Sequence, residues 1–246
     1  MDAPSTGRTP NPVTPYLDGL EVVLARARLG NASTLAVAAR IIEDVVARDG
    51  IVYVFGCGHS QLVALELNRR AGGLANVQVI LDPTWGAAEQ LDGYGENLVA
   101  GMVPSPADCL VVVSHSGVTP APVAIALWGR ARGLPLVAVT SVAASRAATP
   151  LHASGRRLFE LADAVLDNGG RGADASMHVA GFEGGMGPTS TIVAAALLHE
   201  VVVSAVAGLA ARGVVAPVLL ANAERGGRAH NQSVLGRYRG RLERVL

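Results

Sequence analysis

Short apolar runs rich in β-branched residues alternate with helical segments along most of this chain, and this alternation limits the folds open to it. The runs cover residues 51–55, 77–81, 110–113, 136–139 and 164–166. Runs of this length predict strands, and the helical segments between them require right-handed crossovers and hence a parallel sheet. With 29 glycines and only 4% aromatic residues, the apolar composition suits a parallel sheet that helices cover on both faces. We therefore expect an α/β fold with three layers, α/β/α, around five parallel strands.

Composition excludes several classes of protein. Hydrophobic residues make up 50% of the 246-residue chain and charged residues 16%, a balance that excludes a disordered chain. Two cysteines cannot cross-link a chain of this length, which excludes a disulfide scaffold. Twenty basic residues balance twenty acidic ones, so the net charge gives no reason to expect nucleic acid or an anionic membrane as a partner. We predict neither.

The first 15 residues differ from the rest of the chain. They are polar, contain four prolines and lack an apolar core, so they predict a disordered leader rather than a secretory signal. Apolar residues with helical spacing follow over residues 16–49, with one interruption. Because no linker divides residues 16–246, we expect a single domain that begins with these helices. Without a signal, a cytoplasmic location with Cys57 and Cys109 reduced is predicted.

The longest apolar stretch covers residues 192–211. Its length would suit a membrane span, but His199 and Glu200 lie at its centre, where a bilayer makes an ionisable pair costly. We therefore predict a helix that is buried in the protein or in a subunit interface.

The turns that end the predicted strands carry the candidate binding residues, because ligands of open parallel sheets bind beyond the carboxyl ends of the strands. Residues 114–119, Ser-His-Ser-Gly-Val-Thr, place Ser114, Ser116 and Thr119 around one glycine at the start of a helix. Capping that helix needs only one of these hydroxyls. Backbone amides at a helix start, a glycine that permits close approach and additional hydroxyls together bind an anion without lysine or arginine. The turn therefore predicts a phosphate site.

The turn at residues 56–60, Gly-Cys-Gly-His-Ser, is a weaker signal. Ser60 is placed to cap a helix predicted over residues 61–70. The turn is not a dinucleotide fingerprint, because Gln61 stands where the third glycine belongs, and no Gly-Lys-Ser follows as in a Walker loop. Glycines are also common in turns that bind nothing, so the residues leave open whether this turn binds a ligand or only reverses the chain.

The two turns together resemble those of the SIS (sugar isomerase) family, whose members bind phosphorylated sugars. Residues 56–60 match its first motif, residues 114–119 match its Ser-x-Ser-Gly-x-Thr phosphate loop, and residues 140–141 also fit. The resemblance implies a flavodoxin-like sandwich, a homodimer or homotetramer, and a site that a neighbouring subunit often completes. Further stretches are similar to a bacterial SIS subgroup named as phosphosugar isomerases: residues 70–74, 81–83, 172–175, 187–191 and 230–231.

The resemblance also implies which residues form the site. The residues that would hold the phosphate come from the second turn: Ser114, His115, Ser116, Gly117 and Thr119. The residues that would surround the sugar come from three other strand or helix ends: Gly56, Gly58, Ser60, Thr140, Ser190 and Thr191.

Isomerisation of an aldose to a ketose needs a base that moves a proton between C1 and C2. Several SIS enzymes carry a glutamate ten residues after the serine of the first motif, but Arg70 occupies that position here, and the nearest acid is Glu66. Because the two residues are four apart, they share one side of a helix. An ion pair with Arg69 or Arg70 is the alternative role for Glu66.

Three further side chains are candidates for acid–base roles. Glu200 lies in a very apolar helix, where burial would raise its pKa, and a subunit-interface contact is its alternative role. His59 lies in the first turn, and His230 lies in a polar, glycine-rich segment that can reach a partner's pocket. We expect no cofactor and no metal, because Cys57, His59 and His115 lack the spacing of a zinc site.

The predicted function is an isomerase that acts on a hexose or amino-sugar 6-phosphate by removing the proton next to the carbonyl. A lyase that eliminates across C2–C3 of an N-acetylamino-sugar phosphate begins with the same step, so the sequence does not separate the two. A sugar-phosphate sensor without catalysis is the third alternative. The substrate depends on residues 84–105 and 168–187, two segments without a clear structural pattern.

Overall fold

The computed structural model describes residues 15–170, 174–179 and 181–242. Its main sheet has five parallel strands in the order β2-β1-β3-β4-β5, as the alternation of strands and helices predicted. The expected leader lies outside the described residues up to residue 14, and the first helix begins at Pro15. The strands are β1 (Val52–Gly56), β2 (Val77–Ile80), β3 (Cys109–Val113), β4 (Leu136–Thr140) and β5 (Ala164–Asp167).

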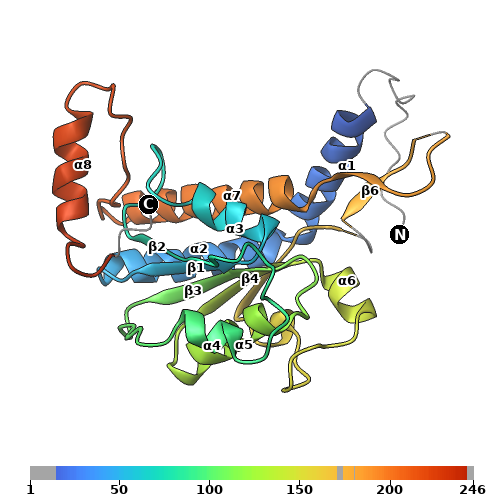
Figure 1. Cartoon of the computed structure of the whole chain (residues 1–246). Helices are drawn as coiled ribbons and strands as arrows, with labels where there is room; N and C mark the ends of the chain where they lie inside the picture. Colours follow the sequence, from blue (N-terminus) through green and yellow to red (C-terminus); the bar gives the residue numbers. More distant parts are fainter. Residues whose placement is uncertain (1–14, 171–173, 180, 243–246) are drawn as a thin grey trace.

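Helices cover both faces of this sheet, which confirms the expected three-layer sandwich with helices at its N-terminus (Figure 1). One face carries α1 (Pro15–Gly30), α2 (Ala32–Ala47), α3 (His59–Glu66) and α7 (Ser190–Ala211). The other face carries α4 (Tyr94–Leu98), α5 (Pro120–Ala131) and a 3-10 helix (Leu158–Glu160). The remaining elements are α6 (Val142–Ala147), the hairpin strands β6 (Ala175–Met177) and β7 (Met186–Pro188), and α8 (Gly227–Gly236).

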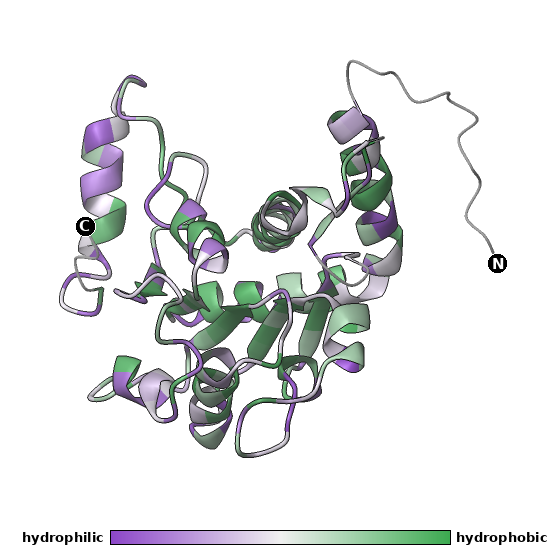
Figure 2. Cartoon of the chain, turned by 45° about the vertical axis from the view of Figure 1, so that its right-hand side comes forward, coloured by the Kyte–Doolittle hydropathy of each residue, from purple (hydrophilic) through white to green (hydrophobic). Residues whose placement is uncertain are grey.

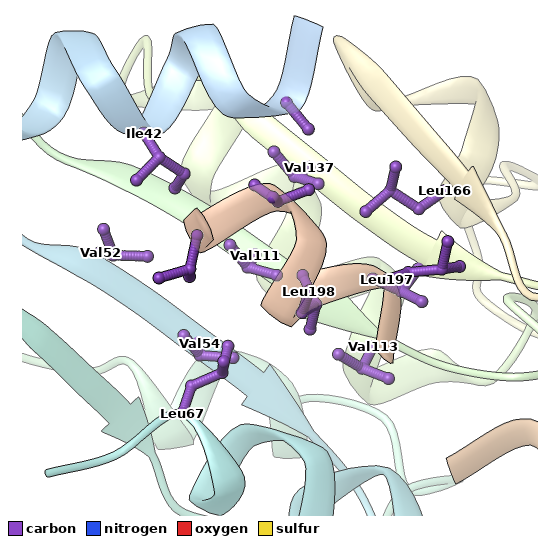
Figure 3. Close-up of a cluster of buried hydrophobic side chains, with 14 of the residues drawn as sticks. Ile42, Val52, Val54, Leu67, Val111, Val113, Val137, Leu166, Leu197 and Leu198 are labelled. Carbon is purple, nitrogen blue, oxygen red and sulfur yellow. The ribbon is translucent and has the colours of Figure 1, made fainter. Parts of the chain in front are cut away.

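Apolar side chains fill both spaces between the sheet and the helices, because the central strands are buried on both faces. Val54 and Val111 pack against Leu198 of α7 on one face (Figure 3). Phe55 and Val112 point to the opposite face and pack in the cluster that contains α5. Figure 2 shows the resulting pattern, with hydrophobic strands in the interior and hydrophilic residues on the outer helices and loops.

The long apolar stretch forms α7, as predicted. By length and composition α7 would suffice to cross a membrane. Its inner side, however, includes Val193, Leu197 and Val201, which are buried against α2 and the sheet. Its outer side leaves Ile192 and Val203 exposed. α7 is therefore a core helix with one apolar side uncovered in the single chain.

The start of α3 differs from the prediction. The helix expected over residues 61–70 begins at His59 and ends at Glu66. Ser60 is the second helical residue and not the cap, because Gly58, with a φ of 53°, turns the chain directly from β1 into the helix. Arg69 has a φ of 50°, which an α-helix cannot accommodate, so the helix ends before it.

Candidate functional site

The two predicted turns lie next to each other at the carboxyl edge of the sheet. Gly56 at the end of β1 pairs in register with Val113 at the end of β3. β1 continues into α3 on the α7 side of the sheet, whereas β3 leads to α5 on the other side. Open α/β sheets bind ligands at such a point, where the helices that follow two neighbouring strands lie on opposite faces of the sheet. Residues 56–60 and 114–119 together are called the switch-point site below.

Hydrogen bonds to neighbouring strands fix the backbone of the 114–119 turn. The Ser114 hydroxyl accepts from the Gly117 amide at 3.1 Å. The carbonyl of His115 accepts from the Thr140 hydroxyl at 3.2 Å and from the Ser141 amide at 2.9 Å. Gly117 has a φ of 61°, a conformation that glycine adopts without strain. Thr140 and Ser114 thus hold the turn in place.

The hydroxyl of Thr119 is buried without a hydrogen-bond partner in the part of the chain that the structure describes. Thr119 precedes α5, but its side chain does not cap the helix. The first turn of α5 offers no amide to a ligand, because Pro120 and Pro122 have no N–H and Ala121 donates its N–H to the carbonyl of Glu89 at 3.0 Å. The expected contribution of helix amides to phosphate binding therefore does not hold for α5. A buried polar group without a partner is costly, so the Thr119 hydroxyl is a donor that the described residues leave unused.

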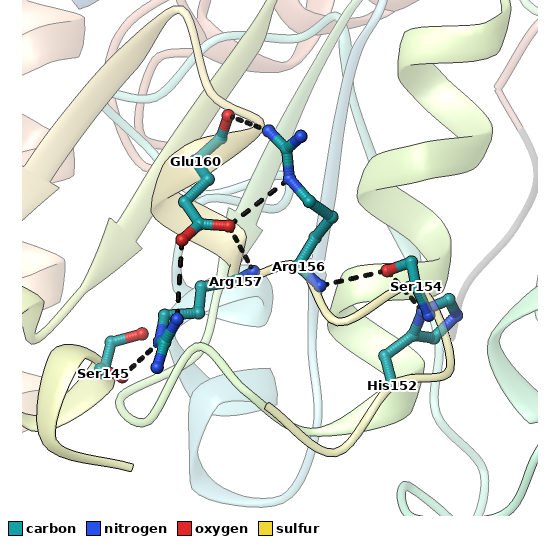
Figure 4. Close-up of polar contacts among 6 residues, drawn as sticks. All are labelled: Ser145, His152, Ser154, Arg156, Arg157 and Glu160. Carbon is teal, nitrogen blue, oxygen red and sulfur yellow. Dashed lines mark hydrogen bonds and ion pairs between the residues drawn. The ribbon is translucent and has the colours of Figure 1, made fainter. Parts of the chain in front are cut away.

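The segment at residues 145–160 supports the turn from outside. The amide of Leu158 donates to the carbonyl of Gly117 at 2.8 Å. Arg157 anchors the segment by donating to two backbone oxygens at the end of α6, at 2.8 and 3.0 Å, and its own amide donates to Glu160 at 3.0 Å (Figure 4). Arg157 is therefore occupied in holding the backbone of this segment in place.

Close packing explains the two glycines of the first turn. A Cβ on Gly56 would lie 2.5 Å from the carbonyl oxygen of Ser60, so only glycine lets α3 start this close to β1. Gly58 lies against Gly86, whose added Cβ would lie 3.3 Å from the Gly58 Cα. His59 is exposed and Ser60 is half-buried at the start of α3. Of the first turn, His59 and Ser60 are thus the side chains open to a ligand.

Glu66 lies at the end of α3 and has two partners. It forms an ion pair with Arg70, as the alternative interpretation expected. Its carboxylate also contacts Nε2 of His199 on α7 at 3.2 Å. Burial, together with the charge of Arg70, lowers the pKa of His199, which favours the neutral ring. Glu66 and His199 therefore form an acid–base pair that the sequence did not reveal.

Glu200 and His230 are placed apart from the switch-point site in the single chain, and Ser190 already has a partner. Glu200 is exposed on the outer side of α7 and accepts from Ser204 at 3.1 Å. His230 lies on α8, at the far end of α7, where its Nε2 donates to the carbonyl of Val218 at 2.9 Å (Figure 1). The hydroxyl of Ser190 donates to Asp174 at 2.7 Å.

The N-terminus of α7 is therefore capped by a carboxylate. Asp174 accepts from the amides of Thr189 and Ser190 at 3.1 and 2.8 Å in addition to the Ser190 hydroxyl. Thr191 is half-buried in the same first turn. The Asp174 carboxylate therefore already occupies two backbone amides and the Ser190 hydroxyl at this helix end.

The sequence also did not reveal a pair of acids in the segment that follows β2. Asp82 is 1% exposed, and Glu89 is half-buried close to it and to the Cys57 thiol. Burial acts to raise the pKa of Asp82, but hydrogen bonds from Tyr94, Thr84 and Gly86 outweigh it and lower the pKa. Asp82 directly follows a predicted strand, a signal that could have found it, whereas Glu89 lies in a segment without any pattern.

The Cys57 thiol is held in its neutral form. Burial, followed by the nearby charges of Asp82 and Glu89, raises its pKa far above the usual range, and burial does the same for Cys109. Because the thiolate is the reactive species, we expect iodoacetamide at pH 8 to alkylate neither cysteine in the folded protein and both in urea, as measured by mass spectrometry. Rapid and complete labelling of Cys57 in the folded protein would contradict this environment.

Comparisons with known sequences match this chain to a domain family and to several relatives. A family model described as the SIS domain matches residues 15–141, just over half of the chain. A UPF0309 protein of Listeria monocytogenes is 34% identical over 211 residues, covering 86% of this chain and 90% of the relative. A UPF0309 protein of Streptomyces coelicolor is 35% identical over 242 residues, covering 94% of this chain and 96% of the relative.

Solved structures show the same fold at low sequence identity. The phosphoheptose isomerase of Neisseria gonorrhoeae superposes with a TM-score of 0.53 and 15% identity, covering 79% of this chain and 97% of that one. A protein of Silicibacter pomeroyi named as a candidate phosphosugar isomerase also gives a TM-score of 0.53, with 17% identity, covering 80% of this chain and 51% of that one. The family model and the sequence relatives establish that the chain belongs to the UPF0309 family of SIS domain proteins.

Proposed function

We propose that this protein binds a phosphorylated sugar at the switch-point site and isomerises it by moving the proton next to the carbonyl. The observation that carries the proposal is the 114–119 turn, which combines a fixed backbone with a buried hydroxyl, on Thr119, that has no partner among the described residues. This turn lies where open parallel sheets bind their ligands. The likeness to the fold of a phosphoheptose isomerase supports the same ligand class.

The phosphate would be bound by the side chains of the 114–119 turn that have no structural hydrogen bond to the described residues. Thr119 and the half-buried Ser116 supply hydroxyl donors. The N-terminus of α5, although its amides are occupied, adds a positive partial charge beside them. A phosphate bound in this way would direct the sugar away from the sheet edge, toward the surface formed by α3 and α7.

Glu66 and His199 are the groups on α3 and α7 that can move protons. The neutral imidazole of His199 lies 3.2 Å from the Glu66 carboxylate, and Arg70 pairs with the charged form of the same carboxylate. A charged carboxylate that a neutral imidazole holds in place can take a proton from carbon. The same first step starts an elimination, so the lyase remains the alternative reaction.

A proton NMR time course in deuterated water tests this function. The protein would be incubated with glucose 6-phosphate, N-acetylglucosamine 6-phosphate and sedoheptulose 7-phosphate. Loss of the signal of the proton on the carbon next to the carbonyl, with formation of the aldose or ketose isomer, is the expected result. An unsaturated product would establish the lyase instead. Unchanged spectra together with ligand-induced thermal stabilisation would establish a sensor, and no stabilisation would contradict the phosphate site.

The outer side of α7 supports a homodimer or homotetramer. Ile192 and Val203 are 44% and 63% exposed on it, and Leu62 of the neighbouring α3 is 43% exposed. Exposed apolar residues gathered on one face are typical of protein–protein interfaces. Within such an assembly, Glu200 on the same side of α7 would lie at the interface.

Val203→Glu is therefore expected to shift the protein from at least twice the chain mass of 25.1 kDa to the single-chain mass, because it places a charge in an apolar interface. Light scattering after size-exclusion chromatography measures the mass of the assembly. Val215→Glu is the matched control, since Val215 is 82% exposed but lies after α7. A wild-type protein that is a monomer at high concentration would contradict the proposed interface.

A further inference from the structure

The segment that follows β2 contacts the first turn of the switch-point site and the start of α5, which directly follows the second turn. Gly86, in the middle of the segment, packs so closely on the first turn that an added Cβ would lie 3.3 Å from both the Cα and the N of Gly58. Three residues later, the carbonyl of Glu89 accepts the amide of Ala121 at 3.0 Å, at the start of α5. Glu89 is thus fixed beside the helix that the 114–119 turn begins.

Side-chain contacts hold the start of this segment in place. The Gln61 side chain of α3 accepts the Asp82 amide at 2.6 Å and donates to the Asp82 carbonyl at 3.2 Å. The Asp82 carboxylate accepts from the Thr84 hydroxyl at 2.7 Å and from the Tyr94 hydroxyl at 2.5 Å. Both Gln61 and Asp82 are about 1% exposed. The segment is therefore a fixed part of the site and not a loose loop over it.

The two acids of the segment have different environments. Asp82 has four hydrogen-bond donors, two of them from Thr84 and one each from Gly86 and Tyr94, which stabilise its charged form. For Glu89, burial first and then the charge of Asp82 raise the pKa, while a hydrogen bond from the Cys57 thiol acts in the opposite direction. Two acids whose environments favour opposite protonation states are typical of an acid–base site.

We propose that Glu89 contacts the sugar at the switch-point site and donates the proton that the carbonyl oxygen takes up during isomerisation. The inference rests on the proposed function and adds the proton donor to it. Its geometry comes from the packing of Gly86 on Gly58, the bond from the Ala121 amide to the Glu89 carbonyl, and the hydrogen bond from the Cys57 thiol of the first turn to the Glu89 side chain.

The proton transfers balance without an oxidant or a leaving group. Glu66 removes the proton from C2 of the aldose while Glu89 gives its carboxyl proton to O1, which produces an enediol. Glu89, now a carboxylate, then takes the proton from O2 as the C2 carbonyl forms, and C1 receives the proton held by Glu66. Both glutamates end the cycle in their starting states.

This role has a defined pH dependence. The titratable groups that face Glu89 are Cys57 from the first turn and Asp82 from the end of β2, with Tyr94 of α4 bonded to Asp82. A proton donor must be protonated, so kcat/KM is expected to fall as the pH rises through the raised pKa of Glu89. The same shift means that ionising Glu89 destabilises the fold at high pH. Glu89→Gln is therefore expected to melt above the wild type at pH 8 and together with it at pH 4.

Glu89→Gln keeps the size of the side chain and removes the acidic proton. In the NMR assay, with whichever of the three sugar phosphates the wild type converts, we expect kcat to fall by about 10²- to 10⁴-fold. The thermal shift that the same sugar phosphate produces is expected to persist. Glu96→Gln is the matched control, because Glu96 is exposed on α4 just beyond the segment, and its kcat is expected to equal that of the wild type.

The outcomes separate this inference from the proposed function. Wild-type kcat in Glu89→Gln overturns the inference alone, as does a wild-type kcat/KM that does not fall with rising pH. Glu89→Gln melting below the wild type at pH 8 would show that the carboxyl is held for stability and would also overturn it. A wild type that converts none of the three sugar phosphates overturns the proposed isomerase, and the role of Glu89 with it.

Discussion

Gly117→Ala is expected to weaken sugar-phosphate binding by about 100-fold while leaving the sheet intact. Gly117 has a φ of 61°, and an added Cβ would lie 2.6 Å from the Thr140 hydroxyl oxygen and 3.0 Å from that of Ser145. The backbone of the turn must then move, and a displacement of about 1 Å is enough to weaken recognition by about 100-fold. We also expect the free energy of unfolding to fall by about 1–3 kcal/mol from the strained backbone. Calorimetric titration with fructose 6-phosphate and urea denaturation measure the two effects.

Gly133→Ala is the control that separates backbone strain from the site itself. Gly133 has a similar φ of 71°, and nothing lies within 4 Å of its added Cβ. It follows α5 at the opposite end from Thr119. We expect this variant to lose about 1 kcal/mol of stability and to bind the sugar phosphate as the wild type does. Wild-type affinity in Gly117→Ala would contradict phosphate binding by the 114–119 turn.

Glu66→Gln is expected to lower kcat for exchange of the C2 proton by about 10²- to 10⁴-fold, because the amide cannot accept that proton. KM is expected to change little, since the phosphate contacts lie on the other turn. The ion pair with Arg70 is also lost, but both side chains are partly exposed, at 40% and 47%. Such a pair contributes less than about 1 kcal/mol to stability, so a small change in the unfolding free energy is expected.

A surface ion pair elsewhere provides the comparison for Glu66. Asp163 pairs with Arg130 at 2.8 Å, and the Asp163 side chain is also 40% exposed. Asp163→Asn is expected to change stability by a similar small amount and to leave kcat unaltered. If Glu66→Gln behaves like Asp163→Asn in the NMR assay, Glu66 serves only as an ion-pair partner and the base lies elsewhere.

The sheet was predictable because its strands carry their own signal. β1, β3 and β4 are buried at every position, so each appears in the sequence as a continuous apolar run between turn residues. The hairpin β6–β7 carries no such signal, because its strands have three residues each and β7 is largely exposed. It is held instead by a contact distant in sequence, from the Tyr16 hydroxyl to the Pro188 carbonyl at 2.8 Å.

The site, like the fold, has one part that could be predicted from the sequence and one part that could not. The three hydroxyls of the 114–119 turn lie close together in sequence, so their excess over what one helix cap needs is visible there. His199 and Glu66 are 133 residues apart, and only the packing of α7 on α3 brings them together. Pro120 and Pro122 were visible from the start, and their lack of N–H groups already indicated that α5 offers few amides to an anion.

Amide chemical shifts of the ¹⁵N-labelled wild type, titrated with fructose 6-phosphate and separately with fructose, locate the ligand. We predict that fructose 6-phosphate shifts the amides of Ser116, Gly117 and Thr119, and that fructose alone does not. Shifts confined to the hollow beside α8, which Arg69 and Arg239 line, would contradict a phosphate site at the switch point. So would a spectrum that neither compound changes.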